Sequence, residues 1–247
     1  MANILLVGES WTVHSLHQKG FDTFTTTTYE EGSDLLRNAI EDKGHRLTYM
    51  PSHRVQYDFP KELDSLKEFD VVAVSDIGSN TFLLPDRTFV QGEKEVNKLK
   101  LIKEYVLDGG NFIMFGGYMA FSGINGSSRY GMTDIADVLP VECLNYDDRI
   151  EKPEGITPVV IESNHPIFEG ISSEFPHFLG YNKTILREEA KEIATINEDP
   201  FIAYQTFGKG KSLVFTSDVA PHWGSKEFVT WKNYPLLWDN IIRFMTN

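Results

Sequence analysis

GGNFIMFGGYMAFSG, residues 109–123, is the stretch that decides how this chain folds. It predicts a short apolar strand at 111–115, then a glycine-rich turn, then the start of a helix. That order is typical of a nucleophile elbow, a sharp turn that exposes one side chain between a strand and a helix. A working elbow carries serine or cysteine at its apex, whereas the apex here is Tyr118. The sequence therefore predicts the scaffold of a hydrolytic site without its usual nucleophile.

The segments around this stretch alternate between apolar strands and amphipathic helices. Such alternation indicates parallel βαβ units, so we predict a three-layer α/β/α, flavodoxin-like fold with a mostly parallel sheet. In the first half we expect strands at 3–8, 46–50, 70–75 and 111–115, and helices at 30–43, 61–68 and 93–107. In the second half we expect antiparallel additions, with strands at 157–162, 178–186, 193–197, 201–207 and 212–217, a turn at 208–211 and a helix at 233–245. Because no linker-like composition interrupts residues 1–247, we expect one domain.

Loops at the carboxyl ends of the strands are the expected place for a site in such a sheet. Several of these loops are long, and long loops in compact domains are usually functional. They are 9–29, 76–91, 116–131 and 218–232.

Composition excludes several classes of partner. The net charge of -13 disfavours nucleic acid and anionic membrane surfaces, which both require basic patches. No apolar run approaches the roughly 20 residues of a membrane span, and the first residues lack a secretory pattern, so we expect a cytoplasmic protein. The single cysteine, Cys143, lies among apolar residues and is expected to be an inert, half-buried thiol.

The order of elements resembles the class I glutamine amidotransferase-like superfamily. Within it, the chain is most similar to an uncharacterised amidotransferase-like branch that neighbours the ThuA-like proteins of trehalose utilisation. The segments that carry the resemblance are 3–8, 70–78, 109–123, Asn-His-Pro-Ile-Phe-Glu-Gly-Ile at 164–171 and Ser-Asp-Val-Ala-Pro-His-Trp-Gly at 217–224.

The resemblance also implies a set of roles, of which this chain keeps only part. In active members a cysteine on the elbow attacks the glutamine amide, a later histidine activates it, and a glutamate two positions beyond orients that histidine. Tyr118 stands at the nucleophile position, His222 at the histidine and Gly224 at the glutamate, while Gly78 fits the glycine of the oxyanion loop. A phenol with a pKa of about 10 is a poor acyl acceptor. The resemblance therefore implies that the usual glutaminase activity is absent.

Candidate site residues follow from these positions. We expect His222 to act on a ligand and Asp218 to orient its ring, as a carboxylate does in a triad. Tyr118 either presents its hydroxyl to the cleft or fills the cleft. Glu9 with the His-x-x-His spacing of His14 and His17 is weak evidence for zinc, so neither a metal nor a cofactor is predicted. The residues predicted to contact a ligand are Gly78, Gly117, Tyr118, Trp11, Trp223 and Arg129.

The predicted function is binding of a small polar ligand at the elbow. Analogy with the ThuA-like neighbours, together with the tryptophans, makes a carbohydrate-related ligand the favoured class. One alternative is a hydrolase or isomerase that uses His222 with a carboxylate. Another is a structural or assembly protein whose former active site is filled by Tyr118 packed against Trp223. Self-association as a homo-oligomer is expected, with no interface identified.

Overall fold

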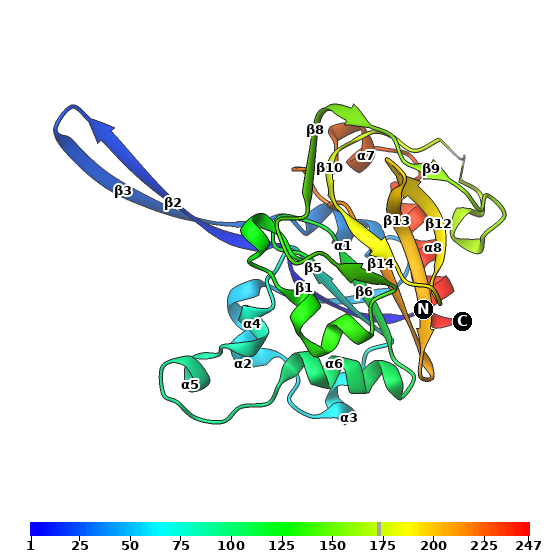
Figure 1. Cartoon of the computed structure of the whole chain (residues 1–247), viewed down its shortest axis with the longest axis horizontal. Helices are drawn as coiled ribbons and strands as arrows, with labels where there is room; N and C mark the ends of the chain where they lie inside the picture. Colours follow the sequence, from blue (N-terminus) through cyan, green and yellow to red (C-terminus); the bar gives the residue numbers. More distant parts are fainter. Residues whose placement is uncertain (172–173) are drawn as a thin grey trace.

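An eight-stranded mixed sheet forms the centre of the protein, as the computed structural model of residues 1–171 and 174–247 describes it (Figure 1). Its first five strands pair in parallel and its last three pair antiparallel. The predicted mostly parallel sheet with antiparallel additions is thus confirmed. In order across the sheet the strands are β4 (Arg46–Met50), β1 (Asn3–Gly8), β5 (Val71–Ser75), β6 (Asn111–Phe115), β14 (Gly210–Phe215), β13 (Asp199–Phe207), β12 (Lys191–Ile196) and β9 (Val159–Val160).

Two apolar layers cover the two faces of the sheet. Along β1, Leu6 points into one cluster with α8 (Tyr234–Thr246), while Leu5 points into the other with α6 (Lys98–Leu107). Consecutive strand residues face opposite sides, so a strand that is apolar throughout must be covered on both. Further helices are α1 (Asp34–Glu41), α2 (Val55–Asp58), α3 (Leu63–Leu66), α4 (Asn80–Leu83), α5 (Asp86–Phe89) and α7 (Lys226–Val229).

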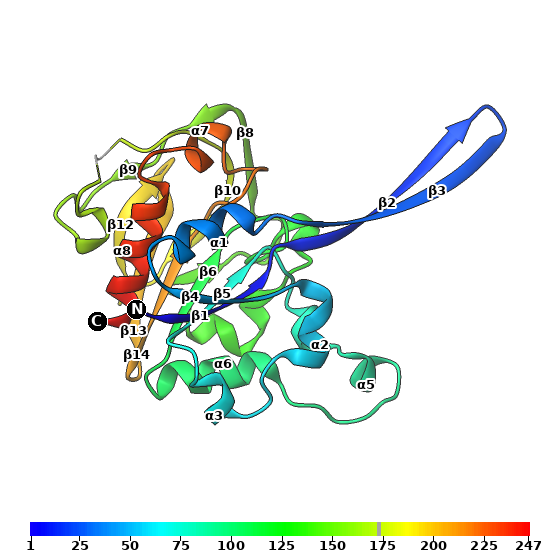
Figure 2. The same ribbon diagram turned by 180° about the vertical axis from the view of Figure 1, so that it is seen from behind.

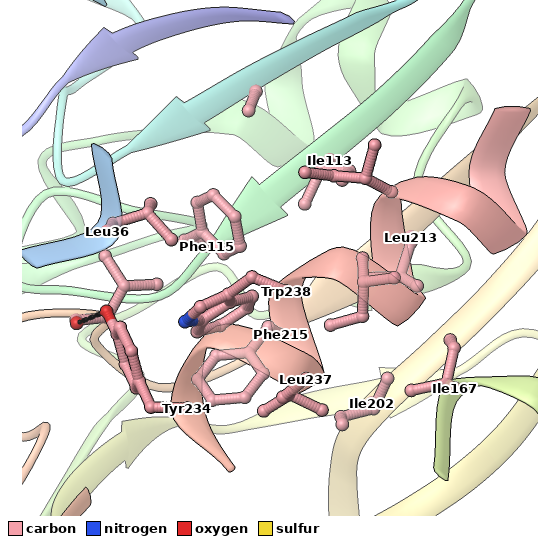
Figure 3. Close-up of a cluster of buried hydrophobic side chains, with 14 of the residues drawn as sticks. Leu36, Ile113, Phe115, Ile167, Ile202, Leu213, Phe215, Tyr234, Leu237 and Trp238 are labelled. Carbon is pink, nitrogen blue, oxygen red and sulfur yellow. Dashed lines mark hydrogen bonds between the residues drawn. The ribbon is translucent and has the colours of Figure 1, made fainter. Parts of the chain in front are cut away.

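Aromatic packing fixes α8 on the sheet. The Trp238 ring lies 5.5 Å from that of Phe115 and 5.2 Å from that of Phe215, both in edge-on geometry (Figure 3). Such edge-to-face pairs add to the free energy of burial. Because Phe115 and Phe215 end β6 and β14, this packing holds the carboxyl ends of the two strands together.

A long β-hairpin projects from the body where a loop and the start of a helix were expected (Figures 1 and 2). Its strands, β2 (Ser10–Lys19) and β3 (Asp22–Glu31), pair antiparallel along their whole length. Gly20, with φ +66, opens the two-residue turn between them. The expectation of a loop at 9–29 was wrong because threonine-rich segments favour strands even when neither face is buried. The helix expected from residue 30 begins at Asp34.

Other boundaries also differ from the predictions. No helix follows the elbow: the chain passes through turns from Gly117 and makes a 3₁₀ turn at Ile124–Gly126. The helix expected from residue 93 starts after Asn97, whose side chain accepts a hydrogen bond from the Lys100 N–H at 3.0 Å. The strand expected at 178–186 is divided in two. The remaining strands are β7 (Val141–Cys143), β8 (Arg149–Ile156), β10 (Phe178–Asn182) and β11 (Thr184–Leu186).

Each helix within residues 1–171 and 174–247 is too short or too polar to cross a bilayer.

Candidate functional site

Three acidic side chains follow the carboxyl ends of sheet strands. Glu9 comes directly after β1, Asp76 directly after β5, and Asp218 shortly after β14. Glu9 and Asp76 adopt φ values of +49° and +40°, a left-handed conformation that is unusual for residues other than glycine. Such backbone strain is found preferentially at functional sites. The strand ends therefore define a candidate site at the edge of the sheet where ligands bind in α/β proteins.

The pKa values of Glu9 and Asp76 are both raised, and the negative charge of Asp218 contributes to both shifts. Burial raises the pKa of Glu9 well above its usual value, and the negative charges of Asp218 and Asp76 raise it further. The Ser75 hydroxyl donates to Glu9 Oε2, whereas buried Oε1 has no hydrogen-bond partner among the described residues. Burial, followed by the charge of Asp218, raises the pKa of Asp76 to about 6, although the Met119 N–H donates to its Oδ1 at 2.6 Å. Glu9 and Asp76 therefore keep their protons to a higher pH than free carboxyl groups do.

His222 is paired with Asp218, the carboxylate that was expected to orient its ring. The distance from His222 Nδ1 to Asp218 Oδ2 is 3.3 Å, and Asp218 is buried while the histidine side chain is 45% exposed. The other oxygen of Asp218 accepts the N–H of Ala220 at 2.9 Å. The hydrogen bond to Asp218 raises the pKa of His222 against the opposing effect of burial. A buried, fixed carboxylate therefore orients an imidazole ring that reaches a cavity.

A cavity of about 580 Å³ opens over these groups. Its volume is in the range of small-molecule sites, roughly 300–1,000 Å³. Aromatic, acidic and apolar side chains share its wall. They are Trp11, Asp76, Tyr118, Glu151, Pro153, Leu179, His222 and Trp223.

Glu151 on β8 organises one side of the cavity. It accepts hydrogen bonds from the Tyr118 hydroxyl at 3.0 Å and from Trp223 Nε1 at 2.9 Å. The Tyr118 and Trp223 rings lie 5.3 Å apart, and the Arg149 guanidinium lies 4.8 Å from the centre of the Tyr118 ring. Burial and the hydrogen bond to Glu151 raise the pKa of Tyr118, so its phenol stays neutral.

Trp11 brings the root of the hairpin into the cavity wall. Its ring lies 5.0 Å from that of His222, and its Nε1 donates to Glu30 Oε2 at 3.1 Å. Trp11 belongs to β2 and Glu30 to β3, so the two strands of the hairpin jointly place this indole.

Gly117 and Gly78 lie near the cavity without lining it. Gly117 has φ +145, and a Cβ there would be 2.6 Å from Asp76 Oδ1, so this position requires glycine. Its N–H donates to Asn182 Oδ1 at 2.9 Å. A Cβ on Gly78 would approach Met119 Cε at 2.9 Å, which places this glycine beneath the elbow.

Arg129 is not brought to this cavity. It lines a separate cavity of about 220 Å³ together with Cys143. A left-handed conformation at Arg129, φ +57, turns the chain there, and its Nη2 lies 3.2 Å from Met132 Sδ. Burial raises the pKa of the Cys143 thiol to about 12, which favours the unreactive form.

His14 and His17 cannot converge on one ion. They are three residues apart on β2, so their side chains project from opposite faces of the hairpin. His14 bonds Thr27 Oγ1 and His17 bonds Thr26 Oγ1, both at 3.0 Å. Within the described ranges, 1–171 and 174–247, no group of three or more His, Cys, Asp or Glu side chains is arranged to hold a metal.

Asp76 and Glu151 are site residues that the sequence analysis did not identify. Asp76 had a usable signal, because it is the first residue after a buried strand, as Glu9 is. Glu151 had none, because it reaches the cavity only through the pairing of β8 with β10.

The fold and this strand-end site define an amidotransferase-like α/β protein. Residues 3–247 match the family described as "Putative glutamine amidotransferase", and the chain belongs to that family. The resemblance stated from the sequence is thereby confirmed.

Two solved structures from Salmonella are similar over nearly the whole chain. Cytoplasmic Protein STM3548 from Salmonella typhimurium is 45% identical, with a TM-score of 0.95 and coverage of 98% of each chain. Cytoplasmic Protein STM1381 from Salmonella typhimurium LT2 is 43% identical, with a TM-score of 0.96 and coverage of 99% of this chain and 100% of that one. A ThuA-like protein from Bacteroides uniformis, 11% identical with a TM-score of 0.58 over 99% of this chain and 91% of its own, shares the fold. The comparison with curated proteins finds no match.

Proposed function

We propose that this protein binds a small, neutral, polyhydroxylated ligand, of the carbohydrate class, in the cavity at the strand ends. The observation that carries the proposal is the wall itself, in which the rings of Trp11, Tyr118 and Trp223 stand beside the carboxyl groups of Asp76 and Glu151. Aromatic faces suit the apolar faces of a sugar ring, and carboxylate oxygens accept hydrogen bonds from its hydroxyls.

The charge of the wall favours a neutral ligand over an anionic one. Asp76 and Glu151 line the cavity, and buried Asp218 lies behind His222. Arg149 reaches Tyr118 from outside this lining and is already paired with Asp147, its Nη2 2.9 Å from Oδ2. With Asp76 ionised, above its pKa of about 6, three carboxylates stand beside one imidazolium, so a sugar acid or a phosphate would meet net repulsion.

Several contacts argue against glutamine hydrolysis in this member of the family. Tyr118, at the elbow apex, is a neutral phenol that donates to Glu151. The N–H groups of Gly117 and Met119, which follow the strand as oxyanion donors would, donate to Asn182 and Asp76. We infer that the protein forms no covalent acyl intermediate.

Proton transfer on the bound ligand is the second candidate function, and the His222–Asp218 contact favours it. His222 would take a proton from a hydroxyl or an acidic C–H group, while Asp218 stabilises the imidazolium that forms. Asp76, with a pKa of about 6, would supply or return a proton near neutral pH. These roles fit an isomerase or a hydrolase without a covalent step. A filled former site is disfavoured, because the Tyr118–Trp223 pair leaves the cavity of about 580 Å³ open.

The cellular location is proposed from relatives. Both Salmonella proteins are named as cytoplasmic. We propose the same compartment for this chain, where a single cysteine is in keeping with a reducing environment.

Thermal unfolding with a ligand panel tests the proposal. Neutral sugars, sugar acids, amino acids and nucleotides are compared on the wild type, His222→Ala and a control, His177→Ala, whose histidine is 39% exposed away from the cavity wall. A neutral sugar at a hundredfold excess over its Kd should stabilise the wild type and the control by about 2.7 kcal/mol, and His222→Ala much less. Stabilisation by acidic ligands alone, or by none of the panel, would contradict the proposal. Proton exchange or conversion of the bound sugar, followed by NMR, then distinguishes the enzyme from the binding protein.

A further inference from the structure

The β2–β3 hairpin, hereafter the arm, is a sheet with no covered face. Every residue of β3 is exposed, and in β2 full burial is limited to Ser10 at the root. Both views show the arm extending away from the body (Figures 1 and 2). Aromatic contacts with the body lie at its root, where the Trp11 ring is 5.0 Å from that of His222 and the Tyr29 ring is 5.2 Å from that of His53. A two-stranded hairpin that stands alone is only marginally stable in water. A contact with a partner surface would therefore stabilise an arm of this length.

The arm presents apolar side chains on both of its faces. Cross-strand pairing places Leu16 opposite Thr25 on one face, and His17 opposite Phe24 on the other. Leu16 is 71% exposed, Phe24 47%, and Phe21 at the turn is fully exposed. The outer edge of β3 carries a run of uncharged, β-branched residues at 25–28 without proline or lysine, the devices that usually protect an edge strand.

The charge of the arm indicates which kind of partner fits. Residues 12–29 contain one lysine, Lys19, and one aspartate, Asp22, so their formal charge is zero while the chain carries -13. Nucleic acid and anionic membranes require a basic surface, which the arm lacks. The acidic bodies of two copies repel each other. The neutral arm is a part of the surface that can approach another copy without this electrostatic repulsion.

The dimensions of the arm are sufficient for a stable contact. A strand of ten residues is about 33 Å long, and a two-stranded ribbon is roughly 10 Å wide, so each face offers about 300 Å². A two-fold arrangement covers one face of each arm and the surface that each arm meets, about 1,200 Å² in total. That area is at the lower limit of stable protein interfaces.

We infer that the arm is the docking element of a homo-oligomer, in which each arm lies against a second copy of this chain. The contact is isologous, because each copy supplies one arm and one receiving surface on its body around a two-fold axis. This inference is independent of the ligand proposed for the cavity, since it rests on residues 12–29 alone.

Sedimentation of the purified full-length protein across the micromolar range tests the inference. One variant replaces residues 13–28 by Asn-Gly, which keeps Trp11 and Glu30 at the root. A second carries Leu16→Asp and Phe24→Asp, one charge on each face. The matched control is Phe89→Asp on α5, where the aromatic side chain is 74% exposed. All variants should unfold at a temperature close to that of the monomeric body, because the altered side chains pack on no other element.

The expected result is a wild-type mass of at least twice 28.1 kDa, kept by Phe89→Asp and reduced to 28.1 kDa in both arm variants. A wild type that sediments at 28.1 kDa throughout would overturn the inference, as would arm variants that keep the larger mass. Binding of a monomeric wild type to vesicles of phosphatidylcholine and phosphatidylserine, lost in the arm variants, would also overturn it and assign the arm to a membrane.

Discussion

Replacing Asp76 by asparagine should stabilise the protein at neutral pH. In the folded state the pKa of this carboxyl is raised from 3.8 to about 6, by burial and then by Asp218. At about 1.36 kcal/mol per pKa unit, holding Asp76 ionised costs the folded state about 3 kcal/mol at most. Asparagine removes the charge and keeps an oxygen that can accept the Met119 N–H. We therefore expect the free energy of unfolding of Asp76→Asn to exceed that of the wild type by about 1–3 kcal/mol at pH 7.5.

The pH dependence of this gain is the sharper part of the prediction. Between pH 3.8 and about 6 the folded wild type binds its proton more tightly than the unfolded chain. Wild-type stability therefore falls as the pH rises through this window, and the advantage of the asparagine variant grows over the same window. Urea unfolding of both proteins from pH 4 to pH 8 measures it. A gain that does not depend on pH, or a loss of stability at pH 7.5, would refute the reasoning.

Asp239→Asn is the matched control with the opposite sign. Burial alone would raise the pKa of Asp239, but hydrogen bonds from Arg243 and His45 outweigh burial and lower this pKa. Its carboxylate therefore contributes stability above the unfolded pKa, and this contribution is lost as the pH falls through the folded pKa. The asparagine variant should be less stable than the wild type at pH 7.5.

Three further predictions concern other parts of the structure. A Cβ on Gly180 would lie 2.3 Å from Trp223 Nε1, so Gly180→Ala should displace the indole, change tryptophan fluorescence and abolish ligand stabilisation while the protein still folds. Burial raises the pKa of Cys143 to about 12, so a thiol reagent at pH 8 should modify it roughly a thousandfold more slowly in the folded than in the urea-unfolded protein. His45 Nε2 lies 2.8 Å from Asp239 Oδ1 in the interior, so His45→Ala should lower the free energy of unfolding by roughly 1–3 kcal/mol in urea titrations.

The central sheet could be predicted because its strands carry their own signal. Asn3–Gly8, Val71–Ser75 and Asn111–Phe115 are continuous apolar runs, and a strand that is buried on both faces must be apolar throughout. The arm gave no such signal. Its strands bury neither face, so hydrophobic periodicity, which reports burial, was absent and only the threonine content remained.

The site was predictable to the extent that it depends on local spacing. Asp218 and His222 are four residues apart in one loop, and their contact was expected. The meeting of Glu9 with Asp76 depends on the order of strands in the sheet, in which β1 lies beside β5. Glu151 belongs to β8, which lies far along the chain and outside the central sheet, so the sequence near the elbow could not predict its place in the site.

The position of Trp11 has a thermodynamic consequence. This indole is held by Glu30 at the root of the arm and also stands 5.0 Å from His222 in the cavity wall. In the proposed oligomer, the contact of the arm with a second copy and the contact of the wall with the proposed ligand would thus involve the same side chain. If subunit association tightens ligand binding by some factor, the ligand must tighten association by the same factor, because the coupling free energy between two sites is reciprocal. In such a protein, ligand binding would shift the equilibrium from monomer towards oligomer, and dilution alone would lower the affinity for the ligand.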